Sequence, residues 1–548
     1  MKANYIRIFL LAVIVVIFMQ LMAHWQTLFH PQVSSSNAAK INDKTPAQST
    51  QMIDSKAINN SQSVSQTFDI STHKPIIINT SVFKNVEISP QNGAIIGASL
   101  QNYHVSLKDQ DPMPLLNDDK GTKYIAVPSL MINGKAVDVL FDEHNVKTVD
   151  NITTVTLKGH ATGFEITREY AFNDQSYDIQ ISQQLKNTSA NAQTVVFNNR
   201  LIRQHEAEKS SFSLFDAHSY SFQGAALSST SERFQKESFK DLNESSANVT
   251  TKEGWAAMIQ HYFIGAWAPE KNDTQSIDVY AKSLTQGTYE TGISTTPVVI
   301  EAGKTLSNQS QLYLGPIIKK NLEAVYPYLD KALDYGILSF ISVIIFWLLN
   351  LIHTFVGNWG VAIILVTVII KMLFYPLSAK SYRSMAKMRL LQPRMKKLQE
   401  LYKGDRQKLG RKMMELYREE KVNPASGCLP ILIQIPVFIA LYWVLLESVQ
   451  LRQAPFIFWI HDLATKDPYF ILPILMGISM FVQQRISPTT ADPTQAKIMM
   501  AMPVIFTIFF ASFPSGLVLY WLTNNVISIL QQWYITRKFT ASYKAKRA

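Results

Sequence analysis

GNWGVAIILVTVIIKMLFYP, residues 357–376, is a run of mostly apolar side chains with one lysine, Lys371, inside it. About 20 such residues suffice for an α-helix to cross the hydrocarbon core of a bilayer. A lysine at the centre of such a helix costs roughly 2.5 to 3.5 kcal/mol, so intramembrane cations usually face other helices or a water-filled cavity. We therefore expect a membrane-spanning helix that presents Lys371 to the interior of a helical bundle.

Apolar residues are distributed unevenly along the 548-residue chain. Residues 1–25 and about 338–535 are strongly apolar, whereas residues 26–320 have the composition of a soluble protein. The chain is too long for one compact domain, and we expect a membrane part and a water-soluble part. The only cysteine, Cys428, excludes a disulfide framework within the chain.

The net charge of +11 is concentrated in two segments. Residues 378–427 contain 14 Lys/Arg and 5 Asp/Glu, and residues 537–548 contain 5 Lys/Arg and no acid. Basic runs can indicate nucleic-acid binding, but beside membrane spans they first indicate cytoplasmic loops. We expect both segments in the cytoplasm, and no recognition of a specific nucleic-acid sequence.

The N-terminal residues 1–25 contain the apolar stretch IRIFLLAVIVVIFMQLMA, with Lys2 and Arg7 at its start. We interpret this segment as an uncleaved signal-anchor span with a cytoplasmic N-terminus. A cleaved signal peptide is the alternative, but the apolar run is longer than usual and no clean A-x-A site follows it. Residues 26–60 are rich in Ser, Asn, Gln, Thr and Lys and are predicted to form a flexible linker.

In residues 61–322 apolar and polar side chains alternate, as in half-buried strands. Phe164, Ile166, Tyr170 and Phe172 are examples. Many short strands with this pattern predict a large antiparallel β-sandwich, placed in the periplasm by the charge distribution.

Histidines and acids in this domain raise the alternative of a membrane-anchored carbohydrate-active enzyme. Neither a G-x-S-x-G nor an H-E-x-x-H motif is present, and scattered histidines in a β-domain are usually structural. We therefore expect no catalytic site, no metal and no cofactor. The residues considered were His104, His205, Glu206, His218 and His261.

Residues 323–357 contain an apolar segment that is long enough to cross the membrane or to lie in its interface. If it crossed, the basic residues 379–427 would lie outside, against the positive-inside rule. We therefore expect a periplasmic interfacial helix, a second span at 358–378, and a cytoplasmic basic helical hairpin at 379–427. Spans three to six follow within 428–535, with short loops, and residues 536–548 form a basic cytoplasmic tail. This arrangement has six crossings and both termini in the cytoplasm.

The hairpin at 379–427 has apolar side chains at helical spacing on either side of a turn at Gly404-Asp405. It could be a solvated basic hairpin that only orients the protein. It could also be a contact surface for a ribosome, a nascent chain or anionic lipid, since methionine makes adaptable apolar contacts. The candidate contact residues are Met385, Met388, Met395 and Met413.

Polar residues of three spans lie at a similar depth. Counted inward at 1.5 Å per residue, Lys371, Gln434, Ser528 and Gln531 lie roughly 6 to 10 Å from the cytoplasmic ends. Helical spacing puts further polar groups on the same faces, namely Thr367 with Lys371, and Tyr520 and Asn524 with Ser528. Lysine snorkelling and helix–helix hydrogen bonds are the alternatives, but the common depth favours a shared hydrophilic groove that opens to the cytoplasm.

The chemistry of this groove favours movement of a polar peptide segment over transport of a solute. A channel must be polar along its whole length, and a coupled transporter usually has intramembrane acids. The predicted spans contain no acid except Glu447, at an outer end. A buried cation with neutral partners would attract an acidic or hydrated segment and lower its barrier to crossing lipid. A transporter or channel remains the alternative.

Several motifs resemble the Oxa1/YidC/Alb3 family of membrane protein insertases, in the long form of Gram-negative bacteria. The resemblance covers about 190 residues and includes YPLSAKSYRSMAKMRLLQP (375–393), EKVNPASGCLPILIQIPVFIALYWVL (420–445), LRQAPFIFWIHDLATKDPYFILPILMG (451–477), SPTTADPTQAKIM (487–499) and FPSGLVLYWLTNN (513–525).

The resemblance implies a non-enzymatic insertase and folding chaperone of the inner membrane, with a five-helix core and a periplasmic supersandwich domain. It implies nascent inner-membrane proteins, the Sec translocon, ribosomes and membrane lipids as partners. The family's groove cation falls at Lys371, where arginine is commoner, and its substrate-contacting tyrosine falls at Tyr520. Lysine keeps the charge but lacks the planar donor fork of arginine.

Overall fold

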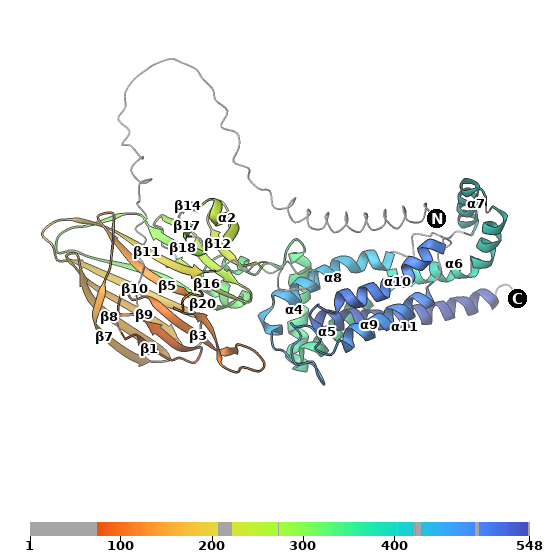
Figure 1. Ribbon diagram of the computed structural model, residues 1–548, viewed down its shortest axis with the longest axis horizontal. Helices are drawn as coiled ribbons and strands as arrows, with labels where there is room; N and C mark the ends of the chain where they lie inside the picture. The colour runs from red at the N-terminus through yellow and green to blue at the C-terminus, as the bar shows by residue number, and fades with distance from the viewer. Residues whose placement is uncertain are drawn as a thin grey trace, which may run out of the picture. The chain divides into compact units, whose positions relative to one another are not determined.

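The computed structural model describes residues 74–205, 222–271, 273–285, 287–402, 404–420, 422, 429–487 and 493–545. The predicted signal-anchor and linker, residues 1–60, lie outside these ranges, as do Glu206, His218 and Cys428. The described residues form a β-domain followed by a bundle of helices (Figure 1).

The β-domain contains two sheets in which all strand pairs between the described residues are antiparallel. The first has the order β1-β2-β3-β5-β11-β18-β17-β14, with β4, β6 and β19 pairing to β3, β5 and β11. Its strands are β1 (Ile76–Ile78), β2 (Phe83–Ile88), β3 (Ile95–His104), β4 (Pro112–Leu116), β5 (Tyr124–Ile132), β6 (Lys135–Val137), β11 (Gln193–Gln204), β14 (Ala247–Thr251), β17 (Ile277–Thr285), β18 (Thr288–Thr295) and β19 (Val298–Ile300).

The second sheet has the order β13-β12-β15-β16-β20-β10-β9-β8-β7. Its strands are β7 (Leu140–Val149), β8 (Ile152–Ala161), β9 (Phe164–Asn173), β10 (Asp178–Asn187), β12 (Gly224–Ser228), β13 (Gln235–Ser238), β15 (Trp255–Gln260), β16 (Phe263–Pro269) and β20 (Thr305–Pro316). The short helix α2 (Phe239–Glu244) follows β13.

The core of the β-domain lies between the two sheets, which confirms the predicted sandwich. Phe164, Ile166, Tyr170 and Phe172 of β9 are all buried in it. They pack with side chains of the other sheet such as Phe83. The alternation along each strand therefore reports which face of the sheet is covered.

A buried arginine joins the two sheets at one place. Arg168 on β9 is fully buried; its Nε and Nη2 donate to Gln183 Oε1 at 3.2 and 2.8 Å, and its Nη1 donates to the carbonyl of Asn92 in the β2–β3 turn. Gly93 follows with φ +58°, and an added Cβ there would lie 2.8 Å from Arg168 Nη1. The turn thus needs glycine so that the guanidinium can reach the backbone.

Replacing Arg168 by methionine is expected to destabilise the β-domain by about 2 to 3 kcal/mol, because two buried acceptors lose their donors. Hydrogen exchange of the full-length protein in detergent, followed by mass spectrometry of β9 and β10 peptides, measures the change. Lys186→Met is the matched control, since Lys186 pairs with Glu165 at the surface and such pairs contribute about 0 to 1 kcal/mol. Equal protection of both variants would contradict the role of Arg168.

The chain after the last strand first packs on the β-domain. Helix α3 (Lys319–Val325) and the 3-10 turn η2 (Leu329–Ala332) share a hydrophobic cluster with β15 and β16. Residues 323–332, which are predicted above to be part of the segment of the interfacial helix, therefore pack on the second sheet of the β-domain. Helix α4 begins only at Ser339.

The rest of the chain contains long helices, and most of them share one apolar core. Within the described residues they are α4 (Ser339–Val356), α5 (Trp359–Leu373), α6 (Tyr375–Leu401), α7 (Arg406–Glu419), α8 (Leu429–Glu447), α9 (Ile471–Ile486), α10 (Pro493–Phe510) and α11 (Ser515–Ala545), with the 3-10 turn η4 (Val449–Leu451) after α8.

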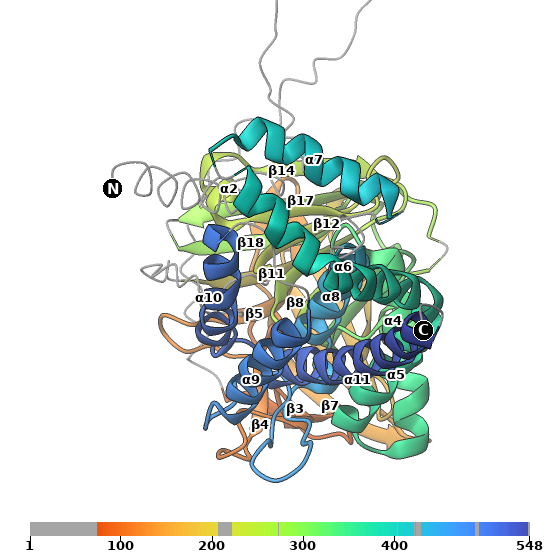
Figure 2. The same ribbon diagram turned by 90° about the vertical axis from the view of Figure 1, so that its right-hand side faces the viewer.

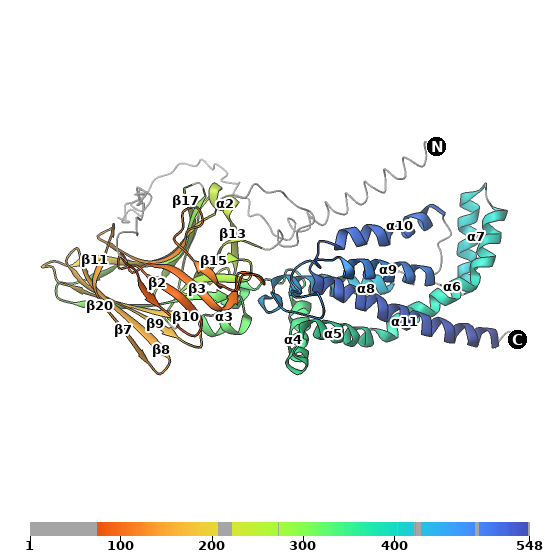
Figure 3. The ribbon, with the colours of Figure 1, turned by 60° about the horizontal axis from the view of Figure 1, so that its bottom comes forward.

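Helix α4 runs crosswise at one end of α5 rather than alongside it (Figure 3), and it contacts α5 and α8. Its 18 residues are long and apolar enough to span a membrane, and it is the only single described helix that meets both conditions. Helices α5 and α6 meet them together but are bent by 68° where they join. Pro376 stands in the first turn of α6, and proline cannot continue a preceding helix without a kink.

Helices α6 and α7 form the basic segment that follows the bend (Figure 2). Their contact is a small apolar cluster of Leu391, Met395, Leu416 and Val422. Helix α6 also lies beside α11, which continues without a break to Ala545. The predicted boundary between the last span and the basic tail, at residue 535, is therefore not the end of the helix.

Candidate functional site: a polar cluster in the helical bundle

Lys371 lies in the last turn of α5, immediately before the bend into α6, and is only 8% exposed. Its ammonium donates a hydrogen bond to Ser528 Oγ of α11 at 2.8 Å. The Ser528 hydroxyl in turn donates to the backbone carbonyl of Asn524 at 2.7 Å. Lys371 forms no ion pair with any described residue. A buried cation is thus held by a neutral hydroxyl, which partly compensates its desolvation.

Gln434 and Tyr520 form a second polar contact at the centre of the bundle. The Gln434 amide on α8 donates to the Tyr520 hydroxyl on α11. The Tyr520 ring stacks on Phe438, one turn further along α8, with centroids 6.4 Å apart. Tyr520 is 1% exposed, so its orientation is fixed by α8.

Two further polar side chains of α11 have unused acceptors. Asn524 Oδ1 and Gln531 Oε1 are buried and accept no hydrogen bond from the described residues. Buried polar atoms are normally paired, so these oxygens are suited to accept a hydrogen bond from water or from a peptide N–H. Thr367 is buried on the face of Lys371, and its hydroxyl donates to Ile363 O of its own helix at 2.7 Å.

The seven predicted groove residues therefore lie in the bundle interior, and two pairs of them are in direct contact. The structure joins Lys371 to Ser528 and Gln434 to Tyr520. Lys371, Thr367, Tyr520, Asn524 and Ser528 are buried in this conformation, not spread along an exposed groove wall.

The other end of the same bundle is mostly apolar. Ile363, Leu441 and Val444 belong to the core there, together with Leu517 and Val518 at the start of α11. Its buried polar residues, among them Ser342, Ser448 and Asp467, lie outside the Lys371 cluster, which stands where α5 and α11 approach α6.

Sequence reasoning missed Tyr382 on α6. This buried side chain packs against Ala379 and Ile535, and its hydroxyl hydrogen-bonds to Ser528; burial raises the pKa of Tyr382 and this bond opposes the shift. Tyr382 lies beyond the bend at Pro376, so counting along one straight helix could not place it beside Lys371. Pro376 was the feature of the sequence that could have revealed the bend.

A second polar seam of α11, facing α9, was also missed. Asn525 Nδ2 donates to Ser479 Oγ at 3.0 Å, and Gln532 Nε2 donates to Ser487 Oγ at 3.3 Å. Positions 525 and 532 are seven residues apart, which puts them on one helix face. This spacing was visible in the sequence, but Asn524 and Gln531 share it, so only the partners on α9 separate this seam from the Lys371 cluster.

The candidate methionines of the basic hairpin are mostly used inside the molecule. Met395 is buried in the α6–α7 cluster, and Met388 and Met413 pack against it. Met385 packs instead against Tyr382 and Ile535. The exposed apolar side chains of these helices include Leu401 and Met414.

These features define the class: a bundle of apolar helices with a buried polar cluster near one end, joined in the chain to a β-sandwich domain. Residues 351–542 match the family described as 60Kd inner membrane protein, and residues 75–348 match the YidC periplasmic domain. The chain is 55% identical to the membrane protein insertase YidC of Francisella philomiragia subsp. philomiragia over 559 residues, which cover 99% of this chain and all of the relative. It is 52% identical to that of Francisella tularensis subsp. novicida, with the same coverage.

The chain belongs to the YidC family of membrane protein insertases. Membership makes it an inner-membrane protein with a β-rich periplasmic domain and a helical C-terminal core, in a family of insertases and not of enzymes. A crystal structure titled as an active YidC insertase with its first transmembrane domain resolved is 16% identical, covers 84% of this chain and 93% of that chain, and has a TM-score of 0.40.

Proposed function

We propose that this chain inserts proteins into the bacterial inner membrane and assists their folding, through a hydrophilic groove built around Lys371 and open to the cytoplasm. Membership of the insertase family supports the activity. The single observation that supports the groove is the buried ammonium of Lys371, which a serine hydroxyl holds without an acid. An acidic or hydrated peptide segment can displace Ser528, because a charged acceptor forms a stronger hydrogen bond than a neutral hydroxyl.

The remaining polar groups have complementary tasks in this proposal. Asn524 Oδ1 and Gln531 Oε1 would accept hydrogen bonds from the entering backbone, whose unpaired groups are costly in lipid. Thr367 and Gln434 would keep the groove hydrated. Tyr520 and the apolar faces beside it would guide the transmembrane segment into lipid.

The proposed topology has six spans, with residues 1–25 as signal-anchor and both termini in the cytoplasm. Helix α4 would lie in the outer interface, as its crosswise position supports (Figure 3). Only Ser342, Ile345 and Leu349 form its buried stripe, and Ser342 Oγ donates to Ala440 O at 3.1 Å. The rest of α4 exposes large apolar side chains suited to lipid, including Phe340, Ile344, Trp347 and Phe355.

The proposed partners are nascent inner-membrane proteins, the Sec translocon and membrane lipids. The basic hairpin and the basic residues at the end of α11 would contribute a ribosome contact through charge. Met395 would reach a partner only if the hairpin rearranged, because it is buried in the α6–α7 cluster. Methionines 385, 388 and 413 are half-buried and would each offer part of the side chain.

Site-specific crosslinking tests the groove directly. A photoreactive residue at position 520 or 434 is expected to capture a stalled nascent membrane protein. One at position 347, on the exposed face of α4, should capture lipid instead. Crosslinks from 347 but not from 520 or 434 would move the substrate path away from the polar cluster.

Thiol labelling tests whether water reaches the cluster. In a chain with Cys428 replaced by serine, Gln434→Cys and Ser528→Cys are expected to react with a membrane-impermeant maleimide added from the cytoplasmic side. The cysteine at 434 should react faster, because Gln434 is half-buried and Ser528 is 3% exposed. Val518→Cys, buried at the apolar end of α11, is the matched control and should stay unreactive. Protection at both 434 and 528 would mean that the cluster is only a packing seam.

A further inference from the structure

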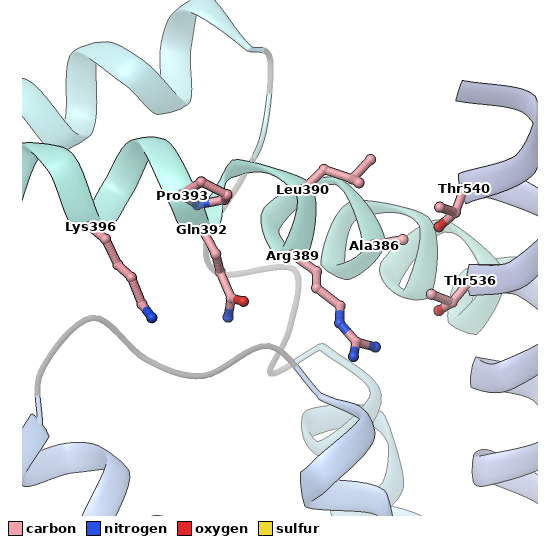
Figure 4. A pocket seen from close by; sticks show the side chains of 8 residues that line it. All are labelled: Ala386, Arg389, Leu390, Gln392, Pro393, Lys396, Thr536 and Thr540. Carbon is pink, nitrogen blue, oxygen red and sulfur yellow. The ribbon is translucent and has the colours of Figure 1, made fainter. Parts of the chain in front are cut away.

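Two adjoining cavities lie where α11 emerges beside α6. The first, of about 600 Å³, is lined by Ala386, Arg389, Leu390, Gln392, Pro393 and Lys396 of α6 and by Thr536 and Thr540 of α11 (Figure 4). The second, of about 510 Å³, shares Arg389, Thr536 and Thr540 with the first and adds Ile486, Trp533, Arg537 and Ala541. Figure 4 shows the side chains of Arg389, Gln392 and Lys396 extending to the same side of α6.

Among the described residues, the charged side chains that line both cavities are all basic. Arg389, Lys396 and Arg537 contribute three cations, and no described Asp or Glu lines either cavity. None of the three forms an ion pair with a described residue, whereas Arg394 on the same helix pairs with Glu420 at 2.6 Å. Uncompensated arginines around a concave site favour an anion, and the guanidinium fork fits phosphate oxygens.

The remaining wall is apolar and aromatic. Ile486, at the end of α9, and Trp533, on α11, face the second cavity. Arg537 lies over the Trp533 ring, with its guanidinium carbon 5.5 Å from the ring centroid. Trp533 and its neighbour Tyr534 are both half exposed, as is typical of aromatic residues at a membrane–water interface. A site with cations on one side and an apolar aromatic wall on the other fits an amphiphile.

We propose that the two cavities form one binding site for an anionic phospholipid of the inner leaflet. Its phosphodiester would lie between Arg389 and Arg537, with Thr536 and Thr540 as hydroxyl donors and Lys396 adding positive charge. Its glycerol and first acyl carbons would lie against Trp533 and Ile486. An RNA phosphate would satisfy the cations but leave this apolar wall unused. This proposal depends on the proposed topology, which puts the cavities at the inner surface of the membrane. It does not depend on insertion activity.

Native mass spectrometry of the full chain in detergent tests the site, with dioleoylphosphatidylglycerol as the probe. The variant Arg389→Gln/Arg537→Gln removes both proposed phosphate ligands. The matched control Arg383→Gln/Lys538→Gln removes the same charge from the same two helices, at positions outside both cavities. Since each cation near an anionic lipid contributes a factor of about five, the first variant is expected to bind phosphatidylglycerol about 30-fold more weakly. The control should stay within about twofold of the unmodified chain.

Each competing occupant gives a distinct result that would overturn the proposal. Equal weakening in both variants would mean attraction by surface charge alone. Equal affinity for dioleoylphosphatidylcholine would mean an apolar groove without phosphate recognition by the cations, and full competition by inorganic phosphate would mean a free-anion site. Loss of ribosome binding with unchanged phosphatidylglycerol affinity would mean an RNA-contacting surface. Thermal unfolding of each variant identifies any folding defect. A variant that loses insertion activity but binds phosphatidylglycerol normally would contradict the proposed groove and not the lipid site.

Discussion

Replacing Lys371 by methionine is expected to slow the insertion of substrates with acidic or polar translocated segments by about tenfold or more. The variant keeps most of the side-chain volume and removes the charge, and hydrogen bonds to charged groups contribute about 1.5 to 3 kcal/mol. Lys371→Arg should retain insertion, because attraction by a point charge survives the exchange. Reconstituted liposomes with a labelled single-span substrate give the rates.

Ser528→Ala is the matched control for this prediction. It removes the only side-chain hydrogen bond described for the Lys371 ammonium and leaves the cation in place. If Lys371 served only to join α5 to α11, Ser528→Ala and Lys371→Met would be equally harmful. If Lys371 attracts substrate, Ser528→Ala should insert nearly normally. Equal rates in the unmodified chain, Lys371→Met and Lys371→Arg would remove the cation from the mechanism.

Replacing Asp467 by alanine is expected to destabilise the helical bundle by about 3 to 5 kcal/mol. Asp467 is buried before α9 and accepts hydrogen bonds from Leu472 N at 2.7 Å, and from Tyr469 N and Trp459 Nε1 at 3.0 Å each. Alanine would leave three donors without this acceptor, including Leu472 N in the first turn of α9, where backbone N–H groups have no intrahelical acceptor.

Thermal unfolding in detergent, with hydrogen exchange of residues 459–475, measures this effect. Asp467→Asn keeps one acceptor oxygen and should lose less stability than Asp467→Ala. Lys466→Ala, at an exposed neighbouring position, should behave like the unmodified chain. Normal stability of Asp467→Ala would show that water replaces the carboxylate at all three donors.

The sequence predicted those features that repeat along a single element. The alternation around Phe164 and Tyr170 predicted the sandwich, because each strand has one covered face. Equal depth predicted that Lys371 and Ser528 belong together, and the two are in contact. Helical spacing put Tyr520 on the face of Ser528, but it did not predict the contact of Tyr520 with Gln434. Depth could not predict that these groups are buried in this conformation, since burial depends on how closely the helices pack.

Contacts between segments that are distant in the chain could not be predicted from the sequence. Arg168 reaches the carbonyl of Asn92, 76 residues away, and no spacing rule connects a strand arginine to a remote turn. Asp467 is an ordinary loop acid until Trp459 folds back onto it. Tyr382 reaches Ser528 only because the chain bends by 68° between α5 and α6.

The unbroken course of α11 has a mechanical consequence. Its 31 residues make a rod of roughly 46 Å at 1.5 Å per residue. Tyr520 and Ser528 stand on the inner part of this rod, and Thr540 stands near its far tip. A force on the C-terminal end of α11 would therefore tilt the whole helix, because no break separates Thr540 from Ser528 and Tyr520. The tilt would reach the contacts of these two residues with Lys371 and Gln434.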